Sequence, residues 1–445
     1  MKQALVLGAG LVTRPMVRYL LEHTPFGVTV ASRTEQKAIA MVQGHPRGRT
    51  VAWTTDDLDT LRRMIQDHDV VISMLPHGFH VQVARLCLDL GKPLVTTSYV
   101  SPEMKALDTE ARERGVLLLN EIGLDPGIDH MSAMRTIDHY RAQGARILSF
   151  ESHCGALPAP EANDNPWGYK FSWSPKGVLQ ASTRAARFLR NGTVYEVKGV
   201  EIFDHVETHT LEDVGTVEVY PNRDSLQYRD LYRIPEVHTL FRGTVRWPGW
   251  AESMAALAHL GYLTEEETID PQGLTYAGFL RRKLGVGPQE DLRRALARRL
   301  GVPEDAPVIE RFAWLGLLEE APVPEDARTP LDLLLHLMLQ KLKYREGERD
   351  MVILQDIVVA ELPDGRRERH ESVLLDFGVV GKETAVARTV SLPAAIAARL
   401  ILEGRVSLTG VWIPTHPEIY EPVLQELQNL GTIMREKVET FSAKM

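Results

Sequence analysis

Several features are scarce in this sequence, and each scarcity excludes a class of protein. The 445 residues contain two cysteines, Cys87 and Cys154, so disulfides cannot form its framework, and we predict a reducing, cytoplasmic location. No apolar run approaches the ~20 residues that span a bilayer, so no membrane partner is expected. The formal net charge of −9 and the lack of a long Lys/Arg run argue against nucleic-acid binding.

Metal-ligand spacing is also nearly absent. The closest approach is His205-x-x-x-His209, but neither a helical pattern nor a cysteine accompanies this pair. We therefore expect two histidines in loops or strands and no metal site. No internal repeat or low-complexity tract is present, and 44% apolar residues over this length are ordinary for a globular protein of two or three domains.

A glycine turn lies at the start of the chain. Residues 4–7 are predicted to form a buried strand, Gly8 and Gly10 a tight turn, and residues 15–21 the following helix. Such a turn directs backbone N–H groups and a helix dipole at a pyrophosphate. The usual third glycine is replaced by Thr13, so the motif alone also fits an ordinary strand, turn and helix.

The end of the second predicted strand distinguishes between two dinucleotides. Residues 28–31 form this strand and are followed by Ser32, Arg33 and Thr34, with no Asp or Glu to bind ribose hydroxyls. A guanidinium between two hydroxyls suits a 2′-phosphate, and it can also stack on adenine. These residues favour NADP over NAD.

Strands and helices alternate up to about residue 122. Short apolar strands with amphipathic helices between them indicate a doubly wound, Rossmann-type parallel sheet in an α/β fold. Cys87 is predicted to be a small apolar residue on the inward face of its helix. The predicted strands are residues 4–7, 28–31, 50–53, 70–74, 94–96 and 116–119.

Polar residues follow three of these strands, at the edge where ligands bind in such sheets. His77 and His80 follow the fourth strand and are predicted to lie in a loop. Ser98 and Tyr99 follow the fifth strand. Asp125 follows the sixth and is predicted to bind a ligand, to cap a helix beginning near residue 128, or to do both, since a capping Asp can still offer one oxygen to a ligand.

The pattern changes after Gly144. Residues 146–154 predict a strand of a second, more antiparallel sheet, and residues 155–175 predict a long ordered loop of the kind that often binds a ligand. Stretches 220–225 and 242–247 predict two further loops. Residues 251–342 are mostly helical in pattern, Pro363-Asp364-Gly365 predicts a hairpin, and two more helices are predicted over residues 393–402 and 420–427.

Long motifs in this second half, and one just before it, resemble the saccharopine reductase family, the NADP-dependent, L-glutamate-forming saccharopine dehydrogenases. The resemblance extends over essentially the whole chain. The motifs that carry it are residues 118–130 (LLNEIGLDPGIDH), 154–161 (CGALPAPE), 164–174 (DNPWGYKFSWS), 220–225 (YPNRDS), 312–317 (FAWLGL) and 348–355 (ERDMVILQ).

The resemblance implies a chain of three parts and a reaction. It implies a dinucleotide-binding domain over residues 1–125, completed by about 390–445. It also implies a mixed α+β substrate domain over 126–250 and 346–389, with an all-helical insertion over 251–345. The implied reaction interconverts L-saccharopine with L-glutamate and 2-aminoadipate 6-semialdehyde in the aminoadipate route of lysine metabolism. A homodimer is expected.

The resemblance and the residue types together give a set of site residues. Arg223 and Arg246 suit a substrate with three carboxylates, and Asp125 can balance its ammonium. Asp125, Tyr99 and Cys154 are the candidate acids and bases, although Cys154 also fits a polarizable wall. The further substrate residues are Ser98, Phe171, Ser174, Thr244 and Val245. The cofactor residues are Gly8, Gly10, Leu11, Val12, Thr13, Ser32, Arg33, Thr34, Leu75, Thr97, Ser98, Leu124, Asp125, Pro126 and Ser174.

Two other functions compete with this one. A related imine reductase, such as carboxynorspermidine dehydrogenase, would also use NADPH, but its diamine partner would need acidic residues where Arg223 and Arg246 stand. A non-catalytic NADPH-binding regulator would not need the elaborate stretches 154–175 and 220–247. One departure from the family pattern concerns adenine, because Trp53 takes the place of the Asp that commonly ends the third strand.

Overall fold

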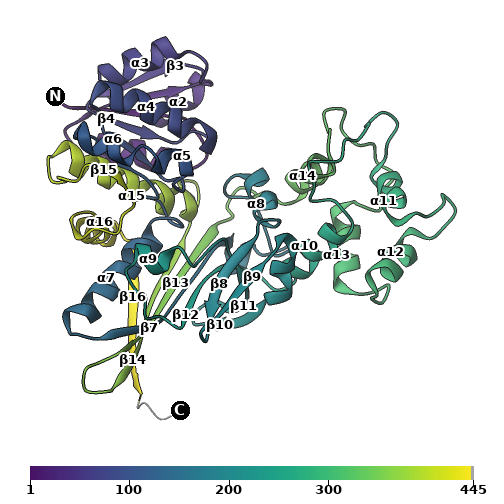
Figure 1. Cartoon of the computed structure of the whole chain (residues 1–445). Helices are drawn as coiled ribbons and strands as arrows, with labels where there is room; N and C mark the ends of the chain where they lie inside the picture. Colours follow the sequence, from purple (N-terminus) through teal and green to yellow (C-terminus); the bar gives the residue numbers. More distant parts are fainter. Residues whose placement is uncertain (442–445) are drawn as a thin grey trace. The chain divides into compact units, whose positions relative to one another are not determined.

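A parallel sheet of seven strands forms the first part of the computed structural model, which describes residues 1–441 (Figure 1). Its strand order is β15-β6-β5-β4-β1-β2-β3, and neighbouring strands pair in parallel throughout. This confirms the predicted Rossmann-type sheet. The strands are β1 (Gln3–Leu7), β2 (Gly27–Ser32), β3 (Gly48–Ala52), β4 (Val70–Ser73), β5 (Leu94–Thr96), β6 (Leu117–Leu119) and β15 (Gly410–Trp412).

The sheet forms because its central strands can be buried on both faces. Every residue of β2 and β4 is buried, and β1 is buried from its second residue onward. Cys87 is fully buried among these apolar side chains, as predicted, and burial raises the pKa of its thiol far above the ordinary value. The connecting helices are α1 (Arg14–His23), α2 (Glu35–Val42), α3 (Leu58–Gln66), α4 (His80–Leu90), α5 (Pro102–Lys105) and α6 (Asp108–Glu113).

The C-terminal part of the chain returns to this first sheet. Strand β15 pairs with β6, and helix α15 (Ala385–Leu402) packs against α1 and α16 (Pro417–Asn429). Our prediction that a helix begins at Pro393 was wrong, because α15 begins eight residues earlier and contains Pro393. Thr384 caps the true N-terminus by accepting a hydrogen bond from Ala387 N at 3.0 Å.

Helix α15 is unusually long and apolar. Within residues 1–441 it is the one helix long and apolar enough to cross a membrane, and 78% of it is buried inside the chain. A core helix of a folded domain satisfies the same criterion of length and hydropathy.

A second sheet follows the strand order β10-β11-β12-β7-β13-β14-β16, with β8 pairing to β12 and to β9. The pairs β10–β11, β11–β12 and β14–β16 are antiparallel. The predicted hairpin is confirmed, since Leu362 N donates to Arg366 O at 2.8 Å between β13 and β14. The strands are β7 (Arg146–Pro158), β8 (Ala186–Arg190), β9 (Thr193–Val197), β10 (Glu207–Leu211), β11 (Gly215–Pro221), β12 (Thr239–Arg246), β13 (Asp350–Glu361), β14 (Arg367–Phe377) and β16 (Met434–Phe441).

Five helices lie in the stretch predicted to be mostly helical, α10 to α14, and four of them begin with a capping residue or a proline. Asp291 and Thr329 cap α12 and α14, and Pro307 opens α13. These helices are α10 (Trp250–His259), α11 (Tyr276–Leu284), α12 (Leu292–Leu300), α13 (Pro307–Leu315) and α14 (Pro330–Lys341). Outside this stretch, the helices not yet named are α7 (Ile128–Ala142), α8 (Pro175–Ala181), α9 (Tyr228–Leu231), η1 (His77–Phe79), η2 (Pro160–Ala162) and η3 (Gly199–His205).

The chain divides into two compact units. The first contains Met1–Ser149, Leu231–Glu236 and Leu354–Met445, and the second contains Phe150–Asp230 and Val237–Ile353. The predicted site residues are distributed over both units.

Candidate active site

The glycine turn between β1 and α1 places backbone at the carboxyl edge of the parallel sheet. Gly8 has φ +104°, and a Cβ there would lie 2.9 Å from the carbonyl oxygen of Met74 at the end of β4. Strands β1 and β4 are the neighbours at which the strand order of the sheet reverses, which is where doubly wound sheets bind nucleotides. The turn therefore needs glycine at position 8 and has the setting of a dinucleotide site.

Thr13 explains how the turn forms without a third glycine. Its side-chain Oγ1 accepts a hydrogen bond from Gly10 N at 3.2 Å, and Thr13 is fully buried. Pro15 follows in the first turn of α1, where a missing N–H costs nothing. Leu11 is exposed and Val12 is half-buried, so both lie on the accessible side of the turn.

The end of β2 presents the residues predicted to bind a 2′-phosphate. Ser32 is buried and its Oγ accepts a hydrogen bond from Thr34 N at 3.3 Å, while the Arg33 and Thr34 side chains are exposed. Trp53, at the end of the neighbouring strand, is buried and donates from Nε1 to Asp57 O at 2.9 Å. Trp53 thus has a packing role, whereas Arg33 projects a guanidinium into solvent.

His80 was wrongly predicted to lie in a loop. It is the first residue of α4 and is buried, where its ring contacts hydroxyls at the ends of two strands. Nδ1 lies 2.9 Å from Ser73 Oγ, and Nε2 lies 2.8 Å from Ser98 Oγ. Burial, with a smaller effect of His77, lowers the pKa of His80 to about 4, so the ring is neutral near pH 7. A neutral imidazole therefore orients the Ser98 hydroxyl.

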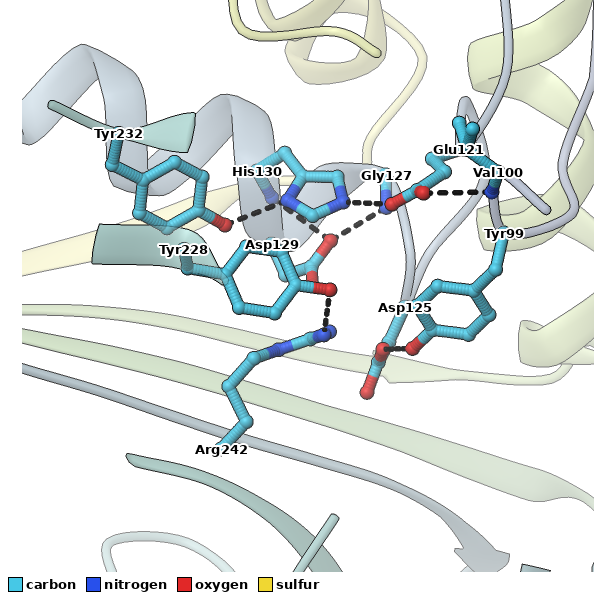
Figure 2. Close-up of polar contacts among 10 residues, drawn as sticks. All are labelled: Tyr99, Val100, Glu121, Asp125, Gly127, Asp129, His130, Tyr228, Tyr232 and Arg242. Carbon is cyan, nitrogen blue, oxygen red and sulfur yellow. Dashed lines mark hydrogen bonds and ion pairs between the residues drawn. The ribbon is translucent and has the colours of Figure 1, made fainter. Parts of the chain in front are cut away.

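Tyr99 and Asp125 come together after β5 and β6. Tyr99 Oη donates a hydrogen bond to Asp125 Oδ1 at 2.7 Å, and both side chains are half-buried (Figure 2). The alternative role of Asp125 as the cap of α7 was wrong. Gly127 is the N-cap of that helix, and its N–H donates a hydrogen bond to Asp129 Oδ1.

The loop that carries Asp125 is tightly folded. Gly127 has φ +149°, and a Cβ there would lie 2.0 Å from Gly123 O, so only glycine fits this crossing of the chain. Gly123 N donates to Pro126 O at 2.9 Å, and Ile128 N donates to Gly123 O at 2.9 Å. Leu124 and Pro126 are buried beside Asp125, and Leu75 and Thr97 are half-buried at the ends of the neighbouring strands.

A buried network next to this loop was not foreseen from the sequence. Glu121 Oε1 accepts from Val100 N at 2.9 Å, and Glu121 Oε2 accepts from His130 Nε2 at 2.8 Å. His130 Nδ1 lies 2.6 Å from Tyr232 Oη (Figure 2). His130 is fully buried and Glu121 is 6% exposed. The network links three separate segments of the first unit.

In the second unit, Arg246 is the most distinctive of the predicted residues. It is 5% exposed and ends strand β12, so our prediction of a loop at this position was wrong. Its guanidinium carbon lies 5.1 Å from the ring centre of Tyr169 and 5.7 Å from that of Trp250. Its Nη1 donates to Val245 O at 2.8 Å, and its Nε has no hydrogen-bond partner among the described residues.

Arg223 lies in the loop after β11, as predicted. Its φ of +58° is unusual for a residue other than glycine, and its carbonyl oxygen accepts from Arg187 N at 2.9 Å. The side chain is half-buried. Nearby, Arg242 is buried with its Nη1 donating to Tyr228 Oη at 2.6 Å (Figure 2).

The remaining predicted residues of the second unit lie on three elements. Cys154 is buried on β7, next to β12 in the sheet. Thr244 and Val245 lie on β12, where Thr244 pairs with Tyr220 of β11. Phe171 is half-buried, and Ser174 is exposed and caps α8 by accepting from Gly177 N at 3.3 Å.

Within the described residues, no group of three or more His, Cys, Asp or Glu side chains is placed to hold a metal ion. His205 ends helix η3 and His209 lies on β10, so the two histidines of the weak spacing motif belong to different elements. In the first unit, hydroxyls and a carboxylate follow the strands beside the glycine turn. The second unit carries the guanidinium groups of Arg223 and Arg246.

Comparison with known proteins identifies the family. The family model described as the saccharopine dehydrogenase NADP binding domain matches residues 4–119, and the saccharopine dehydrogenase C-terminal domain matches residues 123–432. The chain belongs to the saccharopine dehydrogenase family. This confirms the resemblance drawn from the motifs.

Individual members of the saccharopine dehydrogenase family match over the whole chain. Saccharopine dehydrogenase (NADP+, L-glutamate-forming) of Schizosaccharomyces pombe is 35% identical over 447 residues, covering 98% of this chain and 99% of the relative. The Saccharomyces cerevisiae enzyme of the same name is 36% identical over 444 residues, covering 98% and 99%. A solved structure of the apo, histidine-tagged yeast enzyme superposes with a TM-score of 0.90 at 35% identity, covering 99% of this chain and all of that one.

Some features of this saccharopine dehydrogenase family member had only a weak signal in the sequence. Glu121 and His130 stand within the family motif 118–130, but nothing in the sequence pairs them with Tyr232. Lys170 also lies in a family motif, and its contacts with Asp164 and Glu348 depend on folding. Their place in a family motif singles these residues out, but it does not say which partner each side chain contacts.

Proposed function

We propose that this chain catalyses the NADP-dependent interconversion of L-saccharopine with L-glutamate and 2-aminoadipate 6-semialdehyde in lysine metabolism. The observation that carries this proposal is the full-length similarity, at 35–36% identity, to two fungal enzymes named for NADP and for forming L-glutamate. The reaction is an oxidoreduction of a secondary amine, in which a CH–NH group becomes an imine that water then cleaves.

The described residues fit an NADP molecule. Gly8 leaves a space at the edge of the sheet that a side chain would fill, and the exposed Arg33 between two hydroxyl residues suits a 2′-phosphate. When bound, the nicotinamide exchanges a hydride with the carbon that bears the secondary amine. Binding and orientation are the tasks of the residues around β1, β2 and β4.

Arg246 and Arg223 are proposed to bind substrate carboxylates. Saccharopine carries three carboxylates, and a planar guanidinium can bind a carboxylate through two parallel hydrogen bonds. Arg246 supports this role because it is buried between aromatic rings with its Nε unpartnered among the described residues. Thr244, Phe171, Ser174, Val245 and Cys154 are proposed to line the same substrate site.

Tyr99 and Asp125 are proposed to act near the reacting nitrogen. The Tyr99 hydroxyl donates a hydrogen bond to Asp125, so its oxygen can accept a hydrogen bond from a substrate ammonium. The Asp125 carboxylate can balance the positive charge of that ammonium. A proton transferred at the imine or carbinolamine stage needs only a modest acid or base, worth ~10²-fold in rate. Ser98, oriented by His80, is proposed to bind cofactor and substrate nearby.

A saccharopine-dependent assay tests the proposed function. Purified protein with saccharopine and NADP+ is expected to form NADPH and glutamate in equal amounts, with NAD+ a much poorer oxidant. Diaminopropane offered in place of glutamate in the reverse reaction is expected to give no NADPH oxidation. Absence of saccharopine-dependent NADPH formation, or a preference for the diamine, would contradict the proposal.

The Arg223→Ala variant tests the assignment of the substrate residues. We expect it to raise the KM for saccharopine about 10-fold or more, because one charge-assisted contact is lost, while the KM for NADP changes less than about twofold. Equal losses for the two ligands would show that Arg223 supports the fold rather than the substrate.

The domain boundaries and the assembly are also proposals. We propose a dinucleotide domain over residues 1–125 completed by 390–445, a substrate domain over 126–250 and 346–389, and a helical insertion over 251–345. A cytoplasmic homodimer remains our prediction. Both cysteines are buried and are not joined in a disulfide, which is compatible with a reducing compartment. Light scattering coupled to gel filtration, at a chain mass of 49.9 kDa, distinguishes a dimer from a monomer.

A further inference from the structure

Glu121 joins the two loops that carry Tyr99 and Asp125. Its Oε1 accepts from the backbone N–H of Val100, which is the residue after Tyr99, and its Oε2 accepts from His130 at the start of α7. Asp125 lies between Glu121 and His130 in the sequence, so the loop that contains it is anchored at both ends (Figure 2). One carboxylate therefore fixes both segments.

The backbone around Glu121 reinforces this arrangement. Glu121 has φ +55°, a conformation uncommon for a residue other than glycine, and its N–H donates to Ser98 O at 3.1 Å. The main chain and the side chain of Glu121 thus contact residues on both sides of Tyr99. His130 is held in turn by Tyr232, whose Oη lies 2.6 Å from His130 Nδ1.

We propose that Glu121 is a positioning residue of the reaction, and that with His130 and Tyr232 it sets the separation of Tyr99 and Asp125. This inference rests on the proposed function, in which those two side chains meet the substrate. Glu121 itself is buried, and its two carboxylate oxygens accept from Val100 and His130. It therefore acts through the 2.7 Å hydrogen bond between Tyr99 and Asp125.

The chemistry of the network predicts which substitutions are tolerated. A carboxylate only accepts hydrogen bonds, so His130 Nε2 carries the proton that points at Glu121. In Glu121→Gln, the amide oxygen can accept from Val100 N while its NH₂ donates to His130 Nε2, provided that the proton of the ring moves to Nδ1. In Glu121→Ala, both contacts are lost, and the two loops are no longer joined.

The first experiment compares kinetic constants for saccharopine and NADP+. Glu121→Ala is expected to lower kcat about 10- to 100-fold, because small misplacements of catalytic groups have effects of this size, with the KM for NADP changed less than about twofold. Glu121→Gln is expected to retain kcat within about threefold of the wild type. Glu371→Ala is a matched control, because Glu371 is a poorly exposed carboxylate on β14 paired with Gln355 and Arg369, and its kcat is expected to be unchanged.

The second experiment is a double-mutant cycle with Tyr99→Phe, which removes the hydrogen bond to Asp125. If Glu121 acts through that bond, Glu121→Ala is expected to cost less than about threefold in kcat in the Tyr99→Phe background. An equal loss in both backgrounds would overturn the inference, since a general structural role gives additive effects. Retained kcat in Glu121→Ala of the active enzyme would also overturn it.

A folded protein is needed for each of these comparisons. Circular dichroism and NADP binding are measured for every variant, and if Glu121→Ala does not fold, Tyr232→Phe replaces it in the cycle. Tyr232→Phe removes the hydroxyl that meets His130 and leaves both contacts of Glu121 in place, so its expected loss in kcat is smaller, about three- to tenfold, and is again suppressed in the Tyr99→Phe background. An additive loss for Tyr232→Phe would equally overturn the inference. An inactive wild type would overturn the proposed function, and with it this inference.

Discussion

Lys170 and Arg246 are two cations buried in the same unit, and they are neutralised in different ways. The Lys170 side chain is 2% exposed, and its Nζ lies 2.7 Å from Asp164 Oδ1 and 2.6 Å from Glu348 Oε2. Arg246 is 5% exposed, but its contacts are a backbone carbonyl and the faces of Tyr169 and Trp250. No carboxylate among the described residues pairs with it.

The difference separates a structural charge from one suited to a ligand. A buried charge is costly unless a partner of opposite sign compensates it, and the chain supplies two such partners to Lys170. At Arg246 the aromatic rings provide a partial, electrostatic compensation and leave the charge available to an anion. Burial alone therefore does not distinguish a structural charge from a binding residue, and the lack of a carboxylate partner within residues 1–441 is what supports the proposed role of Arg246.

The largest expected effect concerns Arg246 and the substrate. Arg246→Met is expected to lower kcat/KM for saccharopine at least about 100-fold, because a charge-assisted pair in a buried site is lost. Arg246→Lys is expected to recover part of this, to about 10-fold below wild type, since a point charge remains without the planar fork. Steady-state kinetics, with the KM for NADP as an internal control, measures both effects.

Thermal unfolding of the same Arg246 variants sharpens the comparison. Because no carboxylate of residues 1–441 neutralises the Arg246 charge, its removal is expected to leave the unfolding temperature nearly unchanged. A large loss of stability combined with an unchanged KM for saccharopine would place Arg246 in the same structural class as Lys170.

Lys170 is expected to show the opposite behaviour. Lys170→Met leaves Glu348 without its buried cation and Asp164 paired with Arg345 alone, and we expect the free energy of unfolding to fall by about 2–3 kcal/mol. The reduction is below the range for a fully buried pair because Asp164 and Glu348 are 34% and 15% exposed. Urea unfolding measures the loss, and the KM for saccharopine is expected to stay at the wild-type value. A tenfold rise in that KM would contradict a purely structural role.

The smallest effect is a pH dependence. The hydrogen bond from Lys170, which is the largest cause, holds the pKa of Asp164 below its ordinary value of 3.8. A group with a depressed folded-state pKa stabilises the fold above the unfolded pKa, and this contribution is lost as pH falls through the folded pKa. The difference in unfolding free energy between wild type and Lys170→Met is therefore expected to be constant above about pH 5 and to shrink below pH 3.8. Urea midpoints measured from pH 7 to pH 3 test this, and a difference independent of pH would show that Asp164 does not depend on Lys170.

Local sequence patterns were enough to predict most of the fold. The predicted strands of the first sheet fall within about two residues of the observed ones, because a short apolar run between helices has few alternatives to a buried parallel strand. The glycine turn was found for the same reason, since Gly8 and Gly10 stand directly between the strand and the helix that they join, whereas the contact of Gly8 with Met74 was seen only in the structure. Errors arose where tertiary packing overrode a local preference. Proline favours the first turn of a helix, but Pro393 lies inside the buried helix α15.

The candidate site was only partly accessible to the same reasoning. Motifs singled out Tyr99, Asp125, Arg223 and Arg246 as candidate residues, but they did not show that Tyr99 donates to Asp125 or that Arg246 ends a strand. His80 was misassigned to a loop because its three hydroxyl neighbours come from the ends of two strands, which the sequence does not show to be adjacent.

The sequence by itself determined the parallel sheet, the preference for NADP and the family, because strand periodicity, the Ser32-Arg33-Thr34 end and long motifs are properties of contiguous residues. Only the tertiary structure decided which buried charges are neutralised within the chain. Lys170 meets Glu348 across 178 residues, and His130 meets Tyr232 across 102. Contacts at such separations depend on how distant segments pack, and no local pattern encodes that packing.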